Sequence, residues 1–359
     1  MNKKWILIPS VVLLTTIGML GAPIWKHLWH ALKPQPDVVL DAATTGKTID
    51  TLVAKLNENY IFPDKASQME TVLRQRQQEG RYEGIKDGRQ LAKQLTDDMR
   101  GVVEDRHMSV GFKPGLVLPD DDGVLPPETQ AQWEAQNNIA IRTIMRVMAK
   151  REVEKVERLG ANIGYLKVSG FPPEFLVADK FGEAMNEVAD TDGLIIDLRD
   201  NGGGGIKPVA LLISYFVDER TRLNDMWDRS TGVTRQHWTE DKLAGKRYGA
   251  KKPVMILVGP GTMSAGEDFA YTMQALKRAT VVGANTWGGA NPARPHRIGE
   301  HFYAVIPSRQ VINPITKSNW EGVGVVPDIA AAPEQALAVA QDLLQRRLNG
   351  GAALAAARP

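Results

Sequence analysis

Short apolar runs alternate with segments of helical periodicity from residue 160 to about residue 283. Buried strands are predicted by the runs "NIGYLKVSGF", "GLIIDLR", "PVMILVG" and "ATVVG", and helices by residues 174–189, 206–216 and 265–277 between them. Such alternation makes successive strands parallel, because each helix returns the chain to the same end of the sheet. We therefore expect residues 160–348 to form an α/β domain with a mostly parallel sheet and crossover helices.

A different pattern precedes this domain, at residues 48–112. Apolar residues recur there at helical spacing in three segments, the first ending before Pro63 and the third starting near Asp87. Residues 108–112 then alternate between apolar and other side chains, as in a short strand. We expect a small helical N-terminal subdomain, with His107 at a junction between a helix and a strand.

The remaining segments have the composition of linkers and turns. Residues 33–47 predict a linker, and the small residues of 349–359 predict a flexible tail. Residues 113–159 predict a linker and irregular region, in which a helix and a hairpin are both open for about residues 133–158. Residues 223–238 predict an inserted hairpin.

The first 32 residues are a candidate export segment. Lys3 and Lys4 precede an uncharged stretch from Trp5 to Trp25, which is long enough to cross a bilayer as a helix. The flanking tryptophans and leading lysines favour a membrane anchor, while a possible cleavage site ending at Ala22 leaves a signal peptide open. We expect a single-pass inner-membrane protein whose folded part faces the periplasm, or a secreted protein if the segment is cleaved.

Composition excludes several kinds of site and partner. The chain has no cysteine, which rules out disulfides, thiol nucleophiles and cysteine-ligated metals. Its net charge is only +2, and no basic stripe is interleaved with aromatic residues, so nucleic acid is not predicted as a partner. No histidines have metal-ligand spacing, and neither a metal nor any other cofactor is predicted. The oligomeric state is left open.

Two strand ends of the predicted sheet carry unusual residues, at the edge where open α/β sheets bind ligands. Residues 202–205 are four consecutive glycines, whose N–H groups can approach an oxyanion or only form a turn. "GTMSAGEDFAY" follows the next buried strand and places Ser264 at a helix start, as an N-cap or a nucleophile. Glu267, in the first turn, is interpreted as a structural group at the helix terminus. The Gly-x-Ser-x-Gly elbow of other hydrolases is absent, because Gly261 lies three residues before Ser264.

Five motifs occur together in an order and spacing that resemble peptidase family S41. They are "GYLKVSGF", "DGLIIDLRDNGGG", "VGPGTMSAGEDFAY", "TWGGANP" and "WEGVGVVPDI". The family includes the carboxyl-terminal processing proteases, the tricorn core and the interphotoreceptor retinoid-binding repeats. "LNENYIFPDKA" and "DRHMSV" resemble the helical N-terminal part of the retinoid-binding-like branch. The resemblance covers roughly residues 48–335 and implies a ClpP/crotonase-like core.

The resemblance also implies site residues. Ser264 is the implied nucleophile, His107 the implied base and Glu321 the implied third member of a tricorn-like arrangement. Processing proteases use a lysine base instead, but Gly289 of "WGGAN" occupies the matching position, so a Ser–Lys dyad is not expected. The implied oxyanion donors are the N–H groups of Ala265 and Gly203, with Gly202 as second choice. Arg106 stands where the tricorn pattern has a serine, and its role is open.

Three function classes follow from these observations. The first is an exported serine peptidase that cleaves peptides, or unfolded or terminal protein segments, like a carboxyl-terminal processing enzyme. The second is a non-catalytic binding module for apolar ligands, since the retinoid-binding repeats share the fold. The third is an inactive scaffold at the membrane. Retention of a serine, a histidine and a glutamate at the family positions favours the first, with a peptide or protein as its substrate.

Overall fold

A six-stranded sheet is the centre of the larger domain. The computed structural model describes residues 40–113 and 153–356, with side chains to residue 350. The strand order is β12-β8-β7-β4-β3-β2, and every neighbouring pair is parallel except β3 with β2. The strands are β2 (Val153–Leu159), β3 (Ile163–Val168), β4 (Gly193–Asp197), β7 (Val254–Val258), β8 (Thr280–Gly283) and β12 (Ile329–Ala330). The predicted mostly parallel sheet is confirmed.

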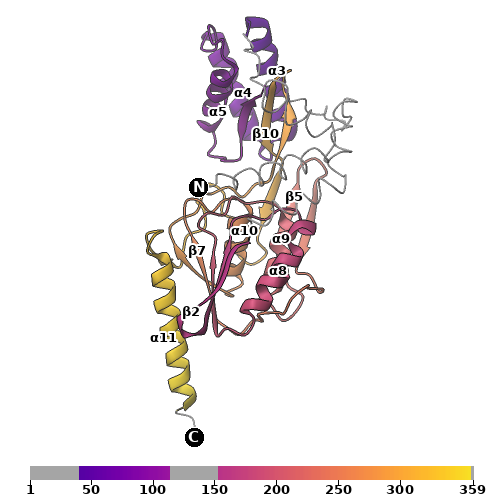
Figure 1. Ribbon diagram of the computed structural model, residues 1–359. Coiled ribbons are helices and arrows are strands. Elements are labelled where there is room, and N and C mark those ends of the chain that lie inside the picture. The colour runs from indigo at the N-terminus through magenta and orange to yellow at the C-terminus, as the bar shows by residue number, and fades with distance from the viewer. Residues whose placement is uncertain (1–39, 114–152, 357–359) are drawn as a thin grey trace, which may run out of the picture.

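Helices cover both faces of this sheet (Figure 1). The helices are α8 (Glu174–Val188), α9 (Ile206–Ser214) and α10 (Ala265–Ala275) on one face, and α11 (Ala336–Ala356) on the other. Leu194 and Ile196 of β4 pack into the core shared with α8, α9 and α10, whereas Ile195 packs toward α11. Because both faces are covered, all five residues of β4 and of β7 are buried, which explains their continuous apolar runs.

The smaller subdomain combines the N-terminal helices with a hairpin from the distant C-terminal half. Helices α3 (Ala42–Asn59), α4 (Pro63–Gln78) and α5 (Gly88–Arg100) are followed by β1 (Ser109–Phe112). Strand β1 pairs antiparallel with β10 (Phe302–Pro307), which in turn pairs with β9 (Ala293–Arg297). Phe302, Ala304 and Ile306 of β10 complete the helical core, and Figure 1 shows this strand rising among the helices. The helical subdomain is therefore not an independent unit of residues 48–112.

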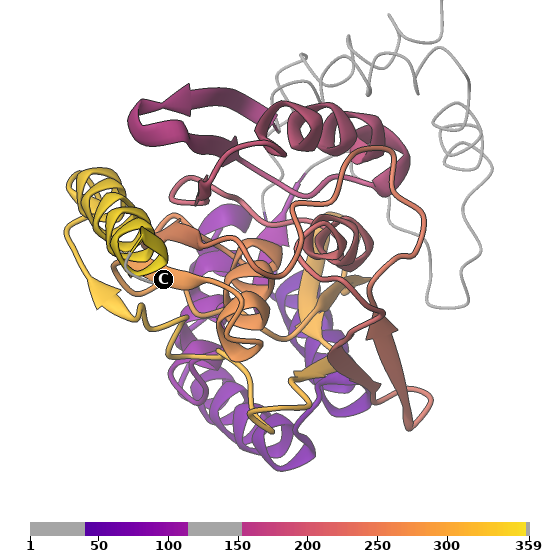
Figure 2. The same ribbon diagram turned by 90° about the horizontal axis from the view of Figure 1, so that it is seen from below.

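A third sheet lies beside α9. Strand β5 (Arg222–Asp228) pairs antiparallel with β6 (Val233–Trp238) on one side and with β11 (Arg309–Ile312) on the other. The hairpin predicted at residues 223–238 is confirmed as β5 and β6, which project from the domain in Figure 2. Strand β11 follows β10 directly, so one segment joins this sheet to the helical subdomain.

Three predicted boundaries differ from the structure. The linker expected at residues 33–47 ends earlier, because Asp41 accepts a hydrogen bond from the N–H of Thr44 and starts α3 at Ala42. The irregular region expected to continue to residue 159 contains β2, whose backbone groups pair with β3. The tail expected at 349–359 is helical to Ala356.

Other predictions fall on residues that lie outside the described ranges. These are the export segment at residues 5–25 and most of the region between 113 and 153. Within residues 40–113 and 153–356, no helix combines the length and apolar character needed to cross a bilayer.

Candidate active site

Ser264 lies between β7 and α10, in a backbone conformation that is rare for a residue with a side chain. Its φ is 48° and its ψ is −111°. Such conformations cost roughly 1–3 kcal/mol and are found mainly at functional sites. The glycine loop packs directly against it, since a Cβ atom at Gly203 (φ 93°) would lie 2.9 Å from the Ser264 Cβ. A glycine at 203 is therefore required for this approach.

Glu267 holds the backbone of Ser264 in place. Its carboxylate is fully buried and accepts the N–H of Ser264 at 2.8 Å. It also accepts the hydroxyl of Thr286 at 2.5 Å and the N–H groups of Gly288 and Gly289 at 2.5 and 3.0 Å. Burial raises the pKa of Glu267, while these hydrogen bonds oppose that change. Its structural role, predicted from its place in the first turn, extends to fixing the loop that follows β8.

The glycine loop is held by its own hydrogen bonds. Asn201, fully buried, accepts the N–H of Gly203 at 2.9 Å, and the Ser169 carbonyl accepts the N–H of Gly202 at 3.0 Å. Neither of these two predicted oxyanion donors therefore has a free N–H in this conformation. The N–H of Ala265 differs: it is the first amide of α10, and no hydrogen bond from it is found within the described part of the chain.

His107 lies just before β1, at the predicted junction, and its ring is packed against the loop after β8. The ring makes an edge contact with Trp287, with centroids 5.0 Å apart and planes at 87°. A Cβ atom at Gly289 would lie 2.8 Å from the His107 Cε1 and 2.2 Å from the Trp287 ring. The space that a lysine side chain at 289 would need is thus occupied by His107 and Trp287.

Glu321 and Asp105 share the surroundings of His107. Donor or acceptor atoms of the three side chains all lie within 4.8 Å of one another. Asp105, almost fully buried, accepts the hydroxyl of Tyr60 at 3.2 Å and the N–H of His107 at 3.2 Å. Glu321 accepts the N–H groups of Ala290 and Asn291 at 2.7 and 2.8 Å. The other Glu321 oxygen and His107 Nδ1 are buried without a hydrogen-bond partner among the described residues.

Burial dominates the ionisation of this cluster. It lowers the pKa of His107 to about 4, so the imidazole is neutral at pH 7 and can accept a proton. It raises the pKa of Asp105 to about 6. Burial, with repulsion from Asp105 as the next cause, raises the pKa of Glu321 to about 7. Both carboxyl groups therefore bind a proton more readily than exposed carboxylates do.

Four consecutive amides connect the serine to the histidine cluster. The N–H groups of residues 288 and 289 bind Glu267 beside Ser264, and those of residues 290 and 291 bind Glu321 beside His107. One loop thus positions both carboxylates. Within the described ranges, no hydrogen bond joins His107 to Ser264.

The sequence pattern of peptidase family S41 matches residues 162–331. A second pattern, the N-terminal domain of peptidase S41 in eukaryotic IRBP, matches residues 30–147. The chain belongs to peptidase family S41. The family resemblance expected from the five motifs is confirmed.

The curated relatives that match by sequence share only part of their length with this chain. A carboxyl-terminal-processing protease of Synechocystis sp. is 30% identical over 133 residues, which are 36% of this chain and 29% of the relative. The tricorn protease of Thermoplasma volcanium is 27% identical over 141 residues, which are 39% of this chain and 12% of the relative. A solved lipoprotein structure from Streptococcus agalactiae has a TM-score of 0.56 at 12% identity, covering 87% of this chain and 100% of its own. That likeness concerns the fold alone.

Several residues of the candidate site were not predicted from the sequence. Asp105 is one, although its place two residues before His107 in "EDRHMSV" was a usable signal. Trp287 and Asn201 are two more. Trp287 contacts His107, which is far along the chain, whereas Asn201 accepts the N–H of Gly203 only two residues later. Lys277 and Lys317, two lysines that could be proposed as alternative bases, are both exposed.

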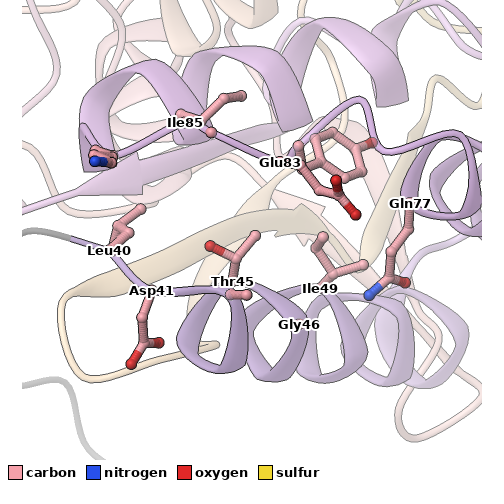
Figure 3. A pocket seen from close by; sticks show the side chains of 12 residues that line it. Leu40, Asp41, Thr45, Gly46, Ile49, Gln77, Glu83 and Ile85 are labelled. Carbon is pink, nitrogen blue, oxygen red and sulfur yellow. The ribbon is translucent and has the colours of Figure 1, made fainter.

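Two other features bear on ligands. Asp105, His107 and Glu321 are near enough to one another to hold a metal ion, although no metal was predicted from the sequence. A cavity of about 510 Å³ lies elsewhere, in the helical subdomain between α3 and the segment after α4 (Figure 3). Its lining includes Leu40, Ile49 and Ile85, and it contains none of the predicted site residues.

Proposed function

We propose that this chain is an exported serine peptidase that hydrolyses peptides, or unfolded or terminal protein segments. Ser264 is the nucleophile, His107 the base, and Glu321 the carboxylate that supports His107. The observation that carries this proposal is the strained backbone of Ser264 (φ 48°, ψ −111°). A serine that served only as a helix cap would adopt an ordinary extended conformation, without that cost.

The chemistry would proceed through an acyl-enzyme. The Ser264 hydroxyl attacks the substrate carbonyl carbon while His107 accepts the hydroxyl proton. The N–H of Ala265, at the positive end of α10, donates to the oxyanion of the tetrahedral intermediate. His107 then gives the proton to the leaving amine, and a water molecule hydrolyses the acyl-enzyme by the same steps.

The carboxyl pair would stabilise the charged form of His107. The imidazole must become cationic after taking the serine proton, although burial favours its neutral form. An ionised Glu321 or Asp105 within 4.8 Å lowers the free energy of the imidazolium by Coulomb attraction. Gly203 joins the oxyanion site only if its N–H leaves Asn201, whereas Ala265 needs no such change.

Export is proposed to depend on the N-terminal segment. Its 21 uncharged residues between Trp5 and Trp25 follow two lysines, a pattern that fits an anchor with the peptidase in the periplasm. Membrane fractionation with carbonate and detergent tests the anchor. A native N-terminus at or after Pro23 would replace the anchor with a cleaved signal peptide.

Fluorophosphonate labelling tests the nucleophile. The wild-type protein should form a covalent adduct at Ser264, identified by peptide mass spectrometry, and should hydrolyse a mixture of unstructured peptides. Ser264→Ala should abolish both without changing the far-UV circular dichroism, since one hydroxyl at a helix start is worth only about 0.5–2 kcal/mol.

A wild-type protein that neither labels nor cleaves would refute the proposal and favour the binding module for apolar ligands. Labelling that persists in Ser264→Ala would place the nucleophile elsewhere. His107→Ala should also remove labelling, while Lys277→Ala and Lys317→Ala should leave it unchanged.

A further inference from the structure

A cavity of about 350 Å³ lies at the opposite edge of the six-stranded sheet from Ser264. Val254 and Thr280, the first residues of the parallel strands β7 and β8, form part of its wall. Helix α10, which starts directly after Ser264 and ends at this cavity, is 11 residues long, or about 16 Å. The cavity is therefore separate from the candidate active site. Its charged lining residues are Lys251, Lys252, Lys277, Arg278, Asp328 and Arg347.

The positive charge of this cavity is not balanced by its lining. Among the described residues that line it, Asp328 is the only carboxylate. Asp328 accepts hydrogen bonds from Gln274 Nε2 at 2.9 Å and from the N–H of Val281 at 2.8 Å. No ion pair to any of the five cations is found in the described part of the chain. The cavity thus has an excess of positive charge that an anion would neutralise.

Two of the cations, Lys252 and Arg278, are held in place by backbone carbonyl groups. Lys252 Nζ donates to two carbonyl groups just after α8, and Arg278 Nε and Nη2 donate to those of Phe216 and Gly249 at 2.7 and 2.6 Å. Burial lowers the pKa of both side chains, because neutral carbonyl groups only partly replace the hydration of a charge. Other carboxylates that act on these two cations, without forming an ion pair, are those of Asp190, Asp192 and Asp218.

The other three cations are exposed, and their side chains have no hydrogen-bond partner among residues 40–113 and 153–350. Lys277 is explained by its place at the C-terminus of α10, where the helix dipole favours a cation. That explanation does not apply to Lys251, which precedes β7, or to Arg347, which lies on α11. Arg347 contributes by repulsion to the lowered pKa of Arg278. An anion placed between these side chains would replace their repulsion with attraction.

We propose that this cavity binds a phosphate group, held by Lys251, Lys252, Arg278 and Arg347. A phosphate monoester carries about −1.5 to −2 charges near pH 7, so it neutralises more of the excess charge than a carboxylate does. Arg278 Nη1 has no acceptor among the described residues and remains available to donate to a phosphate oxygen. The group can belong to a free phosphate compound or to a phospholipid headgroup, which offer the same chemistry. The site contains no residue of the proposed peptidase machinery and is independent of that function.

Calorimetric titration of the full-length protein in a non-ionic detergent, at constant ionic strength set with sodium chloride, tests the site. The ligands are inorganic phosphate, dihexanoyl phosphatidylglycerol, and dihexanoyl phosphatidylcholine as a lipid without net charge. Phosphate, phosphatidylglycerol or both should bind with a Kd of about 1 mM or below, and phosphatidylcholine should bind at least about 10-fold more weakly. Tighter binding of phosphate identifies a free phosphate compound, and tighter binding of phosphatidylglycerol identifies a headgroup.

The variant Lys251→Gln/Arg347→Gln tests the cavity itself. Both side chains are exposed, so the fold should be kept, and the affinity for the preferred anion should fall about 10-fold or more. Lys47→Gln/Arg89→Gln is the matched control, because it removes the same charges from exposed positions of the helical subdomain. At about 10 mM of the preferred anion, the melting temperature should rise in the wild type and the control, and rise less in the cavity variant. Lys251→Arg, which keeps the charge, should keep the affinity.

Absence of binding by both phosphate and phosphatidylglycerol would overturn the inference. Equal affinities of the wild type and Lys251→Gln/Arg347→Gln, or an equal loss in the control variant, would overturn it as well. Binding of phosphatidylcholine as tight as that of phosphatidylglycerol, with none of phosphate, would show recognition of the lipid chains and would also overturn it. Ser264→Ala should bind the preferred anion like the wild type, so a failure of the peptidase proposal is distinguished from a failure of this site.

Discussion

Replacing Glu267 by glutamine should destabilise the protein and disorganise the site together. Each Glu267 oxygen accepts two hydrogen bonds: one oxygen from Ser264 and Gly289, the other from Thr286 and Gly288. A glutamine side chain has one oxygen and one NH₂ group. In either orientation of the amide, two of the four donors would face the NH₂ group, which cannot accept their hydrogen bonds. The carboxylate is fully buried, and water cannot replace the lost acceptors.

The magnitude follows from the number of donors left without an acceptor. A buried unsatisfied donor costs about 1–3 kcal/mol, so two cost about 2–6 kcal/mol of the free energy of unfolding. The raised pKa of Glu267 means that burying its charge already costs stability, which places the expected loss in the lower half of that range. At roughly 2–4 °C per kcal/mol, the melting temperature should fall by at least about 4 °C.

Denaturant titration followed by circular dichroism measures the stability, and fluorophosphonate labelling measures the site. Glu267→Gln should lower the denaturation midpoint and slow labelling, because Ser264 loses the acceptor that fixes its strained backbone. Glu300→Gln is the control, since Glu300 is exposed and the change in charge is the same. A Glu267→Gln protein with the stability and labelling rate of Glu300→Gln would show that this carboxylate does not organise the site.

Three further variants and one treatment test the site. Glu321→Gln should reduce kcat by roughly 100- to 10,000-fold. It should also remove a rise in activity near pH 7, which we expect because Glu321, with its raised pKa, loses its proton as the pH increases through that value. Asp105→Asn should move the midpoint of that pH profile downward, because repulsion from Asp105 contributes to the raised pKa of Glu321; an unchanged midpoint would contradict the coupling. Gly289→Lys should inactivate the enzyme even though it adds an amine, because a Cβ atom at 289 would lie 2.8 Å from His107 Cε1. The control Gly160→Lys should keep the activity, because a Cβ atom at 160 would lie in open space. Incubation with EDTA should leave peptide hydrolysis unchanged, and a loss restored by added metal would contradict a metal-independent mechanism.

The sequence by itself determined the elements of the fold and the chemical types at the site. Continuous apolar runs are typical of parallel strands covered on both faces, and the structure has them as β3, β4, β7 and β8. Asp87 marked a helix start, and Pro63 marked the end of the helix before it, because an N-cap acceptor and a proline both act locally. Ser264 was placed at the start of a helix by the same kind of local signal.

Only the tertiary structure decided which distant residues meet. Strand β10 completes the core of a subdomain that is about two hundred residues earlier in the chain, and no local pattern encodes that pairing. The sequence left open whether the glycine loop binds an oxyanion or only forms a turn. Its amides, however, are taken by Asn201 and Ser169, a choice that depends on three-dimensional hydrogen-bond geometry.

The site cluster illustrates the same division. Motif matching selected His107 and Glu321, which the structure brings within 4.8 Å of each other, but Asp105 emerged only from the packing. The pKa changes of this cluster come from burial, a property of the whole fold that residue types do not reveal. Local sequence sets backbone preferences and chemical groups, whereas burial and long-range contacts set how those groups ionise and which of them act together.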